Sequence, residues 1–277
     1  MNLYNKTCIA CSKLITKQYS TSFSMGIRAF HKKFRWPIYG IYGFVRLADE
    51  IVDTFDNHNQ RKLMNELREE TFKAIEGGIS LNPVLNSFQL VVNQYGINTA
   101  QIEAFLRSME MDLDKKIYDA DSYKTYIYGS AEVVGLMCLK VFCTGDDDLY
   151  HLLVPYARSL GSAFQKVNFL RDMKADYENL GRTYFPSVNF KNFTEHDKRL
   201  VEADIQKDFD NGFAGIKQLP KGVRMGVYIA YRYYLKLFKK INRTPAHSVL
   251  QQRIRISNTR KMALYCNAVV QQKLNII

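Results

Sequence analysis

The stretch QKVNFLRDMKADY, residues 165–177, decides the fold and the chemistry that this chain is expected to have. Its polar residues Gln165, Asn168, Asp172 and Asp176 recur at helical spacing, so they form one stripe on a helix. A spacing of four places the carboxylates of Asp172 and Asp176 on the same face. Burying that stripe without partners would cost several kcal/mol or more. The face is therefore either exposed to solvent or lines a wet cavity that holds cations.

A second acidic pair, Asp49 and Asp53, lies in RLADEIVD, residues 46–53, and has the same spacing. The helix that carries it is rich in apolar and aromatic residues, which indicates a central helix whose acidic turn faces a cavity. Two such faces turned toward each other would hold a hard divalent cation that carries a diphosphate. Mg²⁺ suits such a site because it takes a few carboxylates and completes its octahedron with phosphate oxygens and water.

Donors for a diphosphate lie beside the carboxylates. Arg46 and Arg171 are positioned to bind phosphate oxygens and to reduce the repulsion between the acidic side chains. The segment QYSTSFS, residues 18–24, adds the hydroxyls of Ser20 and Ser22 next to Phe23 and is expected to be a polar break between helices. The alternative for these serines is a simple helix N-cap or turn.

Length and composition indicate an ordinary globular chain. Of the 277 residues, 47% are hydrophobic and 24% are charged, and we expect one all-α domain over residues 1–277. The odd number of cysteines, five, widely scattered, indicates free thiols in a reducing compartment. No apolar run is long enough to span a bilayer, and the N-terminus lacks the core of a signal peptide. We therefore expect an intracellular protein that is not integral to a membrane.

The net charge of +12 is unevenly placed. From Lys221 to the end there are twelve Lys or Arg and no Asp or Glu, whereas the preceding 220 residues hold 27 of each sign. Such a block suits nucleic acid, an anionic membrane surface or a polyanionic substrate. A solvated basic face is the alternative.

Helical periodicity runs through nearly the whole chain, and no alternating run between hairpin turns predicts a strand. Pro37 is expected near a helix start, and Thr194 is expected to cap a helix. About ten helices in one layered bundle are expected, over residues 3–17, 38–55, 60–76, 83–96, 99–116, 122–143, 147–179, 195–217, 223–242 and 246–275.

Several of these segments together resemble the squalene/phytoene synthases, which join two prenyl diphosphates head to head. The matching segments are YSTSF (19–23), IYGFVRLADEIVD (41–53), YIYGSAEVVGLM (126–137) and LGSAFQKVNFLRDMKADYENLGRTYFP (160–186). They occur in the family's order and spacing, and the resemblance covers most of the chain. The pattern QxxNxxRDxxxD followed by GRxYxP is highly specific, whereas DxxxD alone is not.

The resemblance implies an all-α isoprenoid-synthase fold, a helical bundle in which the two acidic motifs face each other across a central cavity. It implies that Mg²⁺, with Mn²⁺ as a substitute, is bound by Asp49, Asp53, Asn168, Asp172 and Asp176. The catalytic residues would be the four aspartates with Tyr128 and Arg171. The substrate-binding residues would be Ser20, Ser22, Phe23, Tyr42, Arg46, Gln165, Asn168, Arg171, Tyr184 and Arg260, with Lys261 as the alternative to Arg260. Tyr42, Tyr128 and Tyr184 would line the cavity.

The activity implied by the resemblance is that of a phytoene synthase, which condenses two geranylgeranyl diphosphates through a cyclopropylcarbinyl diphosphate. The segment DEIVD, residues 49–53, is more similar to this acidic motif in phytoene synthases than to the same motif in squalene and dehydrosqualene synthases. A squalene or dehydrosqualene synthase, using two farnesyl diphosphates, is the alternative, and NADPH is not expected. Two other classes remain open: a non-enzymatic assembly factor of this fold and a nucleic-acid-binding helical protein. A terpene cyclase shares the fold, but its second acidic motif usually has a different spacing.

The expected partners follow from the substrate and the product, which are long hydrocarbons. Release of a hydrocarbon into water is unfavourable, so we expect a cytoplasmic protein with peripheral contact to the inner membrane face, aided by the basic C-terminal helices. No nucleic-acid partner is expected. Chain-length preference and oligomeric state are not indicated by the sequence.

Overall fold

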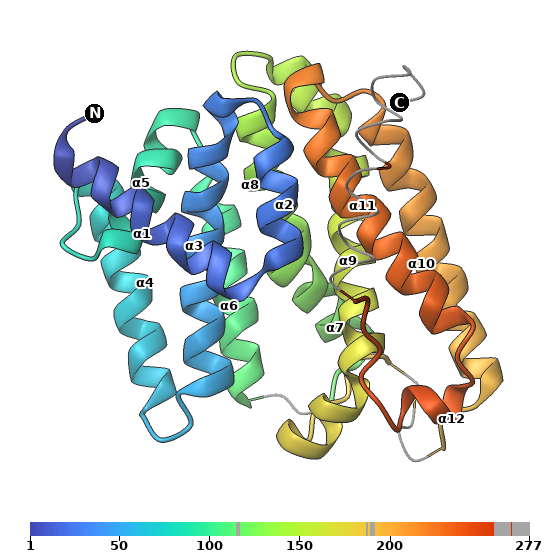
Figure 1. Cartoon of the computed structure of the whole chain (residues 1–277). Coiled ribbons are helices and arrows are strands. Elements are labelled where there is room, and N and C mark those ends of the chain that lie inside the picture. The colour runs from blue at the N-terminus through green and yellow to red at the C-terminus, as the bar shows by residue number, and fades with distance from the viewer. Residues whose placement is uncertain (115–116, 187, 189–191, 258–266, 268–277) are drawn as a thin grey trace.

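Helices account for all the regular secondary structure in the part of the chain that the computed structural model describes, residues 1–114, 117–186, 188, 192–257 and 267. Figure 1 shows them as a bundle with the N-terminal helices on one side and α9, α10 and α11 on the other. The helices are α1 Leu3–Tyr19, α2 Thr21–Ala29, α3 Lys32–Thr54, α4 Gln60–Gly77, α5 Pro83–Tyr95, α6 Thr99–Asp114, α7 Ala120–Ile127, the π-helical turn η1 Tyr128–Glu132, α8 Val133–Phe142, α9 Asp147–Leu180, α10 Glu195–Ile216, α11 Lys221–Asn242 and α12 Ala246–Val249.

Most of the expected helix ends are confirmed by their capping chemistry. Asn82 accepts from two backbone amides of α5, and Pro83 occupies the first position of that helix. Thr194 and Asp197 form a capping box at the start of α10. Gly78 ends α4 in the left-handed conformation, with φ of 68°.

The expected break at residues 18–24 is wrong in extent. The interruption is confined to Ser20, which caps α2 by accepting from the backbone amide of Phe23 at 3.2 Å. The next helix also begins earlier than expected, at Lys32, so Pro37 lies inside α3 and not near its start. The extra turn is held by packing, since Phe34 within it is buried in the core.

The expected single helix over residues 122–143 is divided by η1. At this turn Gly129 passes so close to α6 that a Cβ atom would meet the Ala104 carbonyl oxygen at 2.4 Å. Only glycine permits this approach, and η1 contacts both α6 and α9. Local widening to π-helix is a recurrent feature of functional regions.

The expected helix over residues 246–275 is wrong for residues 250–257, because α12 ends at Val249; residues 258–266 and 268–275 lie outside the described part of the chain. In the sequence RIRI, Ile254 and Ile256 are buried while Arg253 and Arg255 are exposed, a period of two that fits an extended backbone. The carbonyl oxygens of Gln251 and Arg255 accept from Lys174 of α9 and Lys240 of α11, respectively. Arg260 and Lys261 lie outside the described residues.

The packing places α3 at the centre of the N-terminal half and α9 along the other half. α3 contacts α1, α5, α6 and α8, and α9 contacts α8, η1, α10 and α11. Phe44 of α3 stacks on Phe88 of α5 with ring centroids 4.0 Å apart. None of the described helices combines the length and hydropathy needed to cross a bilayer.

Candidate active site

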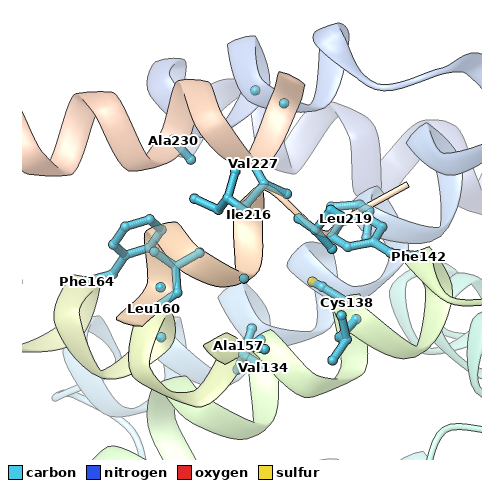
Figure 2. A pocket seen from close by; sticks show the side chains of 18 of the residues that line it. Val134, Cys138, Phe142, Ala157, Leu160, Phe164, Ile216, Leu219, Val227 and Ala230 are labelled. Carbon is cyan, nitrogen blue, oxygen red and sulfur yellow. The ribbon is translucent and has the colours of Figure 1, made fainter. Parts of the chain in front are cut away.

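An apolar cavity of about 240 Å³ lies between α2, η1, α8, α9, α10 and α11. Figure 2 shows Val134 and Cys138 of α8 on one wall, with Ile216 and Val227 of α10 and α11 across from them. Burial among these side chains raises the pKa of the Cys138 thiol to about 12, as expected for a dry apolar environment. The apolar lining therefore suits a hydrocarbon chain.

One face of α9 joins this cavity to the acidic stripe. The cavity-lining positions of α9 run from Leu153 through Ala157 and Phe164 to Gln165, a span of roughly 18 Å at the helical rise. The same face continues beyond Gln165 to Asn168, Asp172 and Asp176. A chain lying in the cavity with its head at Gln165 would therefore place a diphosphate against the aspartates.

The second acidic pair faces the first across the site. Arg182, at the end of α9, lies 3.6 Å from the Asp53 carboxylate of α3 and 3.7 Å from the Asp112 carboxylate of α6. It also donates to the Asp112 carbonyl oxygen at 2.8 Å, and its own amide donates to the Asp176 carbonyl oxygen at 2.8 Å. Arg182 thus links Asp53 of α3 to the end of the helix that carries Asp172 and Asp176.

Crowding of these carboxylates raises their pKa values. Burial raises the pKa of Asp176 to about 7, and repulsion from Asp172 adds to this rise. The attraction of Arg182 opposes the rise, whereas repulsion from Asp53 and Asp112 increases it. Burial and repulsion from Asp53 likewise raise the pKa of Asp49 to about 7 against the attraction of Arg46. Because 34% of the Asp49 side chain is exposed, its carboxyl retains partial hydration, and the pH argument rests on Asp176.

The stability of the metal-free protein is expected to fall as pH rises from about 4 to about 7. In this window the Asp176 carboxyl holds a proton in the folded state that it has already lost in the unfolded state. In EDTA, the Asp176→Asn variant should melt at a higher temperature than the wild type above neutral pH, and the difference should vanish toward pH 4. Equal melting temperatures at all pH values would contradict the raised pKa.

Asp172 is neutralised by two arginines in this structure. Arg171 donates to its two oxygens at 3.0 and 2.5 Å, and Arg253 contacts them at 2.6 and 3.3 Å. Each guanidinium presents a fork that matches the carboxylate. The Arg253 side chain is 47% exposed, so this contact can exchange with a ligand more readily than a buried pair.

Arg46 is held in place by three neighbours. It pairs with Asp49 at 3.4 Å and with Glu50, and its guanidinium lies 4.4 Å from the centre of the Tyr19 ring. Its Nε atom is buried and has no hydrogen-bond partner in the structure. The expected arginine is therefore present beside the first acidic pair with unused donor capacity.

The other expected residues divide between the site and its surroundings. Phe23 and Gln165 line the cavity, and Phe23 stacks on Tyr42 with centroids 4.7 Å apart. The Ser20 hydroxyl caps α2, while Ser22 is half-buried on the same helix.

Tyr42, Tyr128 and Tyr184 are not among the residues that line the apolar cavity. Tyr184 stacks on Phe169 at 4.0 Å and donates to Asp112 at 3.2 Å, beside a small cavity next to Asp176. The Tyr128 ring lies 5.3 Å beneath the Arg158 guanidinium, and Tyr42 packs against Phe23. A direct contact of these rings with substrate remains a prediction.

Four residues in or beside this site were not singled out from the sequence. Arg182 belongs to the quoted GRxYxP pattern, so its signal was present. Asp112 stood out only as an acidic residue on an amphipathic helix, and Arg253 only as one of many basic residues. Tyr234 stacks on Phe164 of the cavity wall at 4.1 Å, and its raised pKa reflects burial first, opposed by the nearby Arg171.

The donor atoms fit a hard divalent cation. The Asn168 Oδ1 atom is buried without a hydrogen-bond partner, directly on the stripe that carries Asp172. Carboxylate and amide oxygens are the ligands that Mg²⁺ takes, with water and phosphate oxygens completing its shell. Among the described residues no three acidic, His or Cys side chains converge closely enough to hold an ion by themselves.

Comparison with known proteins agrees with this geometry. Residues 16–260 match the family model of the squalene/phytoene synthases. The chain belongs to the squalene/phytoene synthase family. Members of this family are prenyltransferases that bind prenyl diphosphates, join them head to head and generally use a divalent metal.

Relatives of this family member have differing products. The chain is 27% identical to phytoene synthase of Arthrospira platensis, over 95% of this chain and 92% of that protein. It is 27% identical to 4,4'-diapophytoene synthase of Staphylococcus haemolyticus (strain JCSC1435), over 70% and 67%. The crystal structure of a dehydrosqualene synthase with ligand matches at a TM-score of 0.81 and 22% identity, over 97% and 98% of the two chains. The fold is therefore the all-α isoprenoid-synthase fold.

Proposed function

We propose that this family member is a phytoene synthase that condenses two geranylgeranyl diphosphates 1-1', with Mg²⁺, and releases diphosphate. The observation that carries the proposal is the single face of α9 that leads from an apolar cavity to two opposed aspartate pairs. The chain is similar over 95% of its length to the phytoene synthase of Arthrospira platensis, and the acidic motif DEIVD, residues 49–53, favours this product over the alternatives.

The residues of the site would divide the work by position. Asp49 and Asp53 on one wall, and Asn168, Asp172 and Asp176 on the other, would hold Mg²⁺, or Mn²⁺ in its place. When bound, the ions would neutralise the leaving diphosphate and promote its departure from an allylic carbon.

The arginines and the cavity wall would complete the reaction. Arg46 and Arg171 would bind phosphate oxygens and hold the leaving group away from the carbocation. Phe23, Phe164 and Gln165 would keep the cation beside the double bond of the second prenyl chain and exclude water from it. The first condensation, with loss of diphosphate and one proton, would give a cyclopropylcarbinyl diphosphate. A second loss of diphosphate, a rearrangement that joins the chains 1-1' and loss of a further proton would give the triene.

Incubation of the purified protein with Mg²⁺ and either farnesyl or geranylgeranyl diphosphate, with and without NADPH, tests the proposal. Mass identification of the hydrocarbon should show phytoene from the C20 donor, with no change on adding NADPH. A C30 product from the C15 donor alone would reject the phytoene assignment in favour of dehydrosqualene synthase, or of squalene synthase if the product requires NADPH. The similarity to a 4,4'-diapophytoene synthase is the observation that favours the use of two C15 donors as the second candidate.

Filling the far end of the cavity is expected to shift the chain-length preference. Cys138 lies near Leu153 and Phe142 at the end away from Gln165, so Cys138→Phe should shorten the space for the donor tail. Each CH₂ that is no longer buried loses about 0.8 kcal/mol, and turnover of the C20 donor should fall far more than that of the C15 donor. Cys138→Ala is the control and should retain both, and equal losses for both donors would contradict this placement of the tail.

We also propose that the protein works in the cytoplasm with peripheral contact to the inner membrane face. The exposed lysines of the last turns of α11, Lys239 and Lys240, support attraction to anionic lipid. Flotation with anionic liposomes at low salt tests the contact, and absence of binding there would reject it.

A further inference from the structure

A second cavity, of about 280 Å³, lies between α1, α2 and α3 and is lined by five cations and no acid. Lys13 and Lys17 come from α1, Arg28 from α2, and Lys32 and Arg35 from α3. Lys32 and Asp49 are separated by 17 residues of α3, roughly 25 Å along the helix. This basic cleft is therefore distinct from the aspartate site.

The positive charge of the basic cleft is uncompensated. None of its five cations forms an ion pair with any described residue. At the aspartate site, by contrast, Asp49, Asp53 and Asp172 each pair with an arginine. The first 48 residues of the chain contain eight Lys or Arg and no Asp or Glu, so no local partner is available in that part of the sequence. Lys13 and Lys17, four apart on α1, repel each other.

The first turn of α3 adds to this unfavourable arrangement. It has no acidic residue, and its N-cap His31 makes no side-chain capping hydrogen bond. Lys32, Lys33 and Arg35 lie where the helix dipole disfavours cations. An anion in the cleft would offset both the repulsion among the cations and the wrong sign of the charges at this helix end.

The floor and wall of the cleft supply further donors. Tyr39 is buried at 4% exposure, and its hydroxyl has no hydrogen-bond partner among the described residues. Burial raises the pKa of the Tyr39 hydroxyl. The charges of Arg28 and Arg35 oppose this rise, so both guanidiniums lie near the hydroxyl. Arg35 donates through Nε to the Phe30 carbonyl at 2.8 Å, which orients its two terminal nitrogens. Trp36 forms an adjacent apolar wall.

From these observations we infer that the basic cleft binds a phosphate group, carried either by an anionic lipid or by a soluble ligand. Guanidinium forks, ammonium groups and a phenol converge on one small space, and their charge exceeds what one carboxylate would balance. The inference does not depend on the reaction catalysed at the aspartate site.

The test measures phosphate binding by the full chain in EDTA, so that the aspartate site holds no metal. The probes are inorganic diphosphate in solution, followed by calorimetry, and phosphatidylcholine vesicles with and without phosphatidic acid, followed by co-sedimentation. The variant Lys13→Ala/Arg28→Ala/Lys32→Ala removes three charges from the cleft. Lys73→Ala/Arg107→Ala/Lys124→Ala removes the same charges from exposed positions on other helices and is the matched control.

The cleft variant should bind at least one probe about a hundredfold more weakly than the wild type, equivalent to about 3 kcal/mol. The control variant should bind nearly as the wild type does, and Lys13→Arg/Lys32→Arg should retain binding. Loss with diphosphate alone identifies a soluble ligand, and loss with phosphatidic acid vesicles alone identifies a lipid headgroup. Wild-type binding of both probes by the cleft variant, or of neither probe by the wild type, overturns the inference.

Failure of this inference is distinguishable from failure of the proposed function. All three substituted side chains of the cleft variant are exposed, so circular dichroism should show an unchanged fold. Turnover of detergent-dispersed prenyl diphosphate should also be unchanged, because none of these residues lies at the aspartate site.

Discussion

Asp172→Asn and Asp49→Asn are each expected to reduce turnover of prenyl diphosphate by about a hundred- to a thousandfold or more, without unfolding the protein. Each aspartate stands on one of the two facing walls, and asparagine keeps the shape while removing the charge that would hold a divalent cation. Neither carboxylate is fully buried, since 19% of the Asp172 side chain and 34% of the Asp49 side chain remain exposed. Asp49→Asn leaves Arg46 paired with Glu50, and Asp172→Asn leaves Arg171 with 19% of its side chain exposed to water.

The measurement is the rate of diphosphate release and of hydrocarbon formation over a range of Mg²⁺ concentrations. If the carboxylates hold the cation, raising Mg²⁺ should recover part of the activity of each variant. The exposed Asp210 of α10 offers a matched control, and Asp210→Asn should leave the rate unchanged. Full activity in either site variant would contradict the metal-binding role of both walls.

The contact between Arg253 and Asp172 adds a condition to this prediction. In the structure, Arg253 and Arg171 together neutralise Asp172, so a cation must displace at least one guanidinium to reach both oxygens. Asp172→Asn removes the anchor of Arg253 as well as a metal ligand. A variant at Arg253 alone separates the two effects, because it leaves the carboxylate available.

Periodicity and motif spacing predicted those helices and those site positions that are set by local sequence signals. The stripe from Gln165 to Asp176 is continuous on α9, and the face it shares with the cavity follows from spacing alone. Arg253 could not be predicted as part of the site, because the backbone of residues 250–257 is set by burial of Ile254 and Ile256 and by lysines of distant helices. Helical propensity does not report such tertiary contacts.

The same limit explains the network around Asp112. Its carboxylate accepts from Tyr126 at 2.7 Å, from Tyr118 at 3.1 Å and from Tyr184 at 3.2 Å, and it pairs with Arg182. These partners come from two stretches of the chain, residues 118–126 and 182–184, so no helical spacing reveals them. The basic cleft could not be predicted for another reason: the sequence shows an acid-free N-terminal stretch but not that its cations line one cavity.

Arg182→Met is expected to destabilise the protein by about 3–5 kcal/mol near neutral pH. Arg182 and the Asp112 carboxylate are 7% and 4% exposed, and removal of the cation leaves a buried anion with only tyrosine hydroxyls as partners. The Asp53 carboxylate loses the same partner but is 43% exposed, so water replaces most of that contact. Arg199→Met, on the exposed face of α10, is the control and should change stability by less than about 0.5 kcal/mol.

The pH dependence identifies the buried anion as the cause. Burial raises the pKa of Asp112 to about 6 in the wild type, against the attraction of Arg182. Loss of that attraction raises the pKa of Asp112 further. In the folded variant Asp112 therefore keeps its proton at pH values at which the unfolded chain has already lost it. Stability of the variant should therefore continue to fall as pH rises above 6, where that of the wild type no longer responds to Asp112.

Urea unfolding at pH values on both sides of neutrality measures this difference. Asp112→Asn added to Arg182→Met should restore stability at alkaline pH, because no charge then remains to be buried. An equal loss at every pH, with no recovery in the double variant, would show that Arg182 acts through packing and its bond to the Asp112 carbonyl. In that case the link between α3, α6 and the end of α9 would be steric, and the two acidic walls would be held in register by shape.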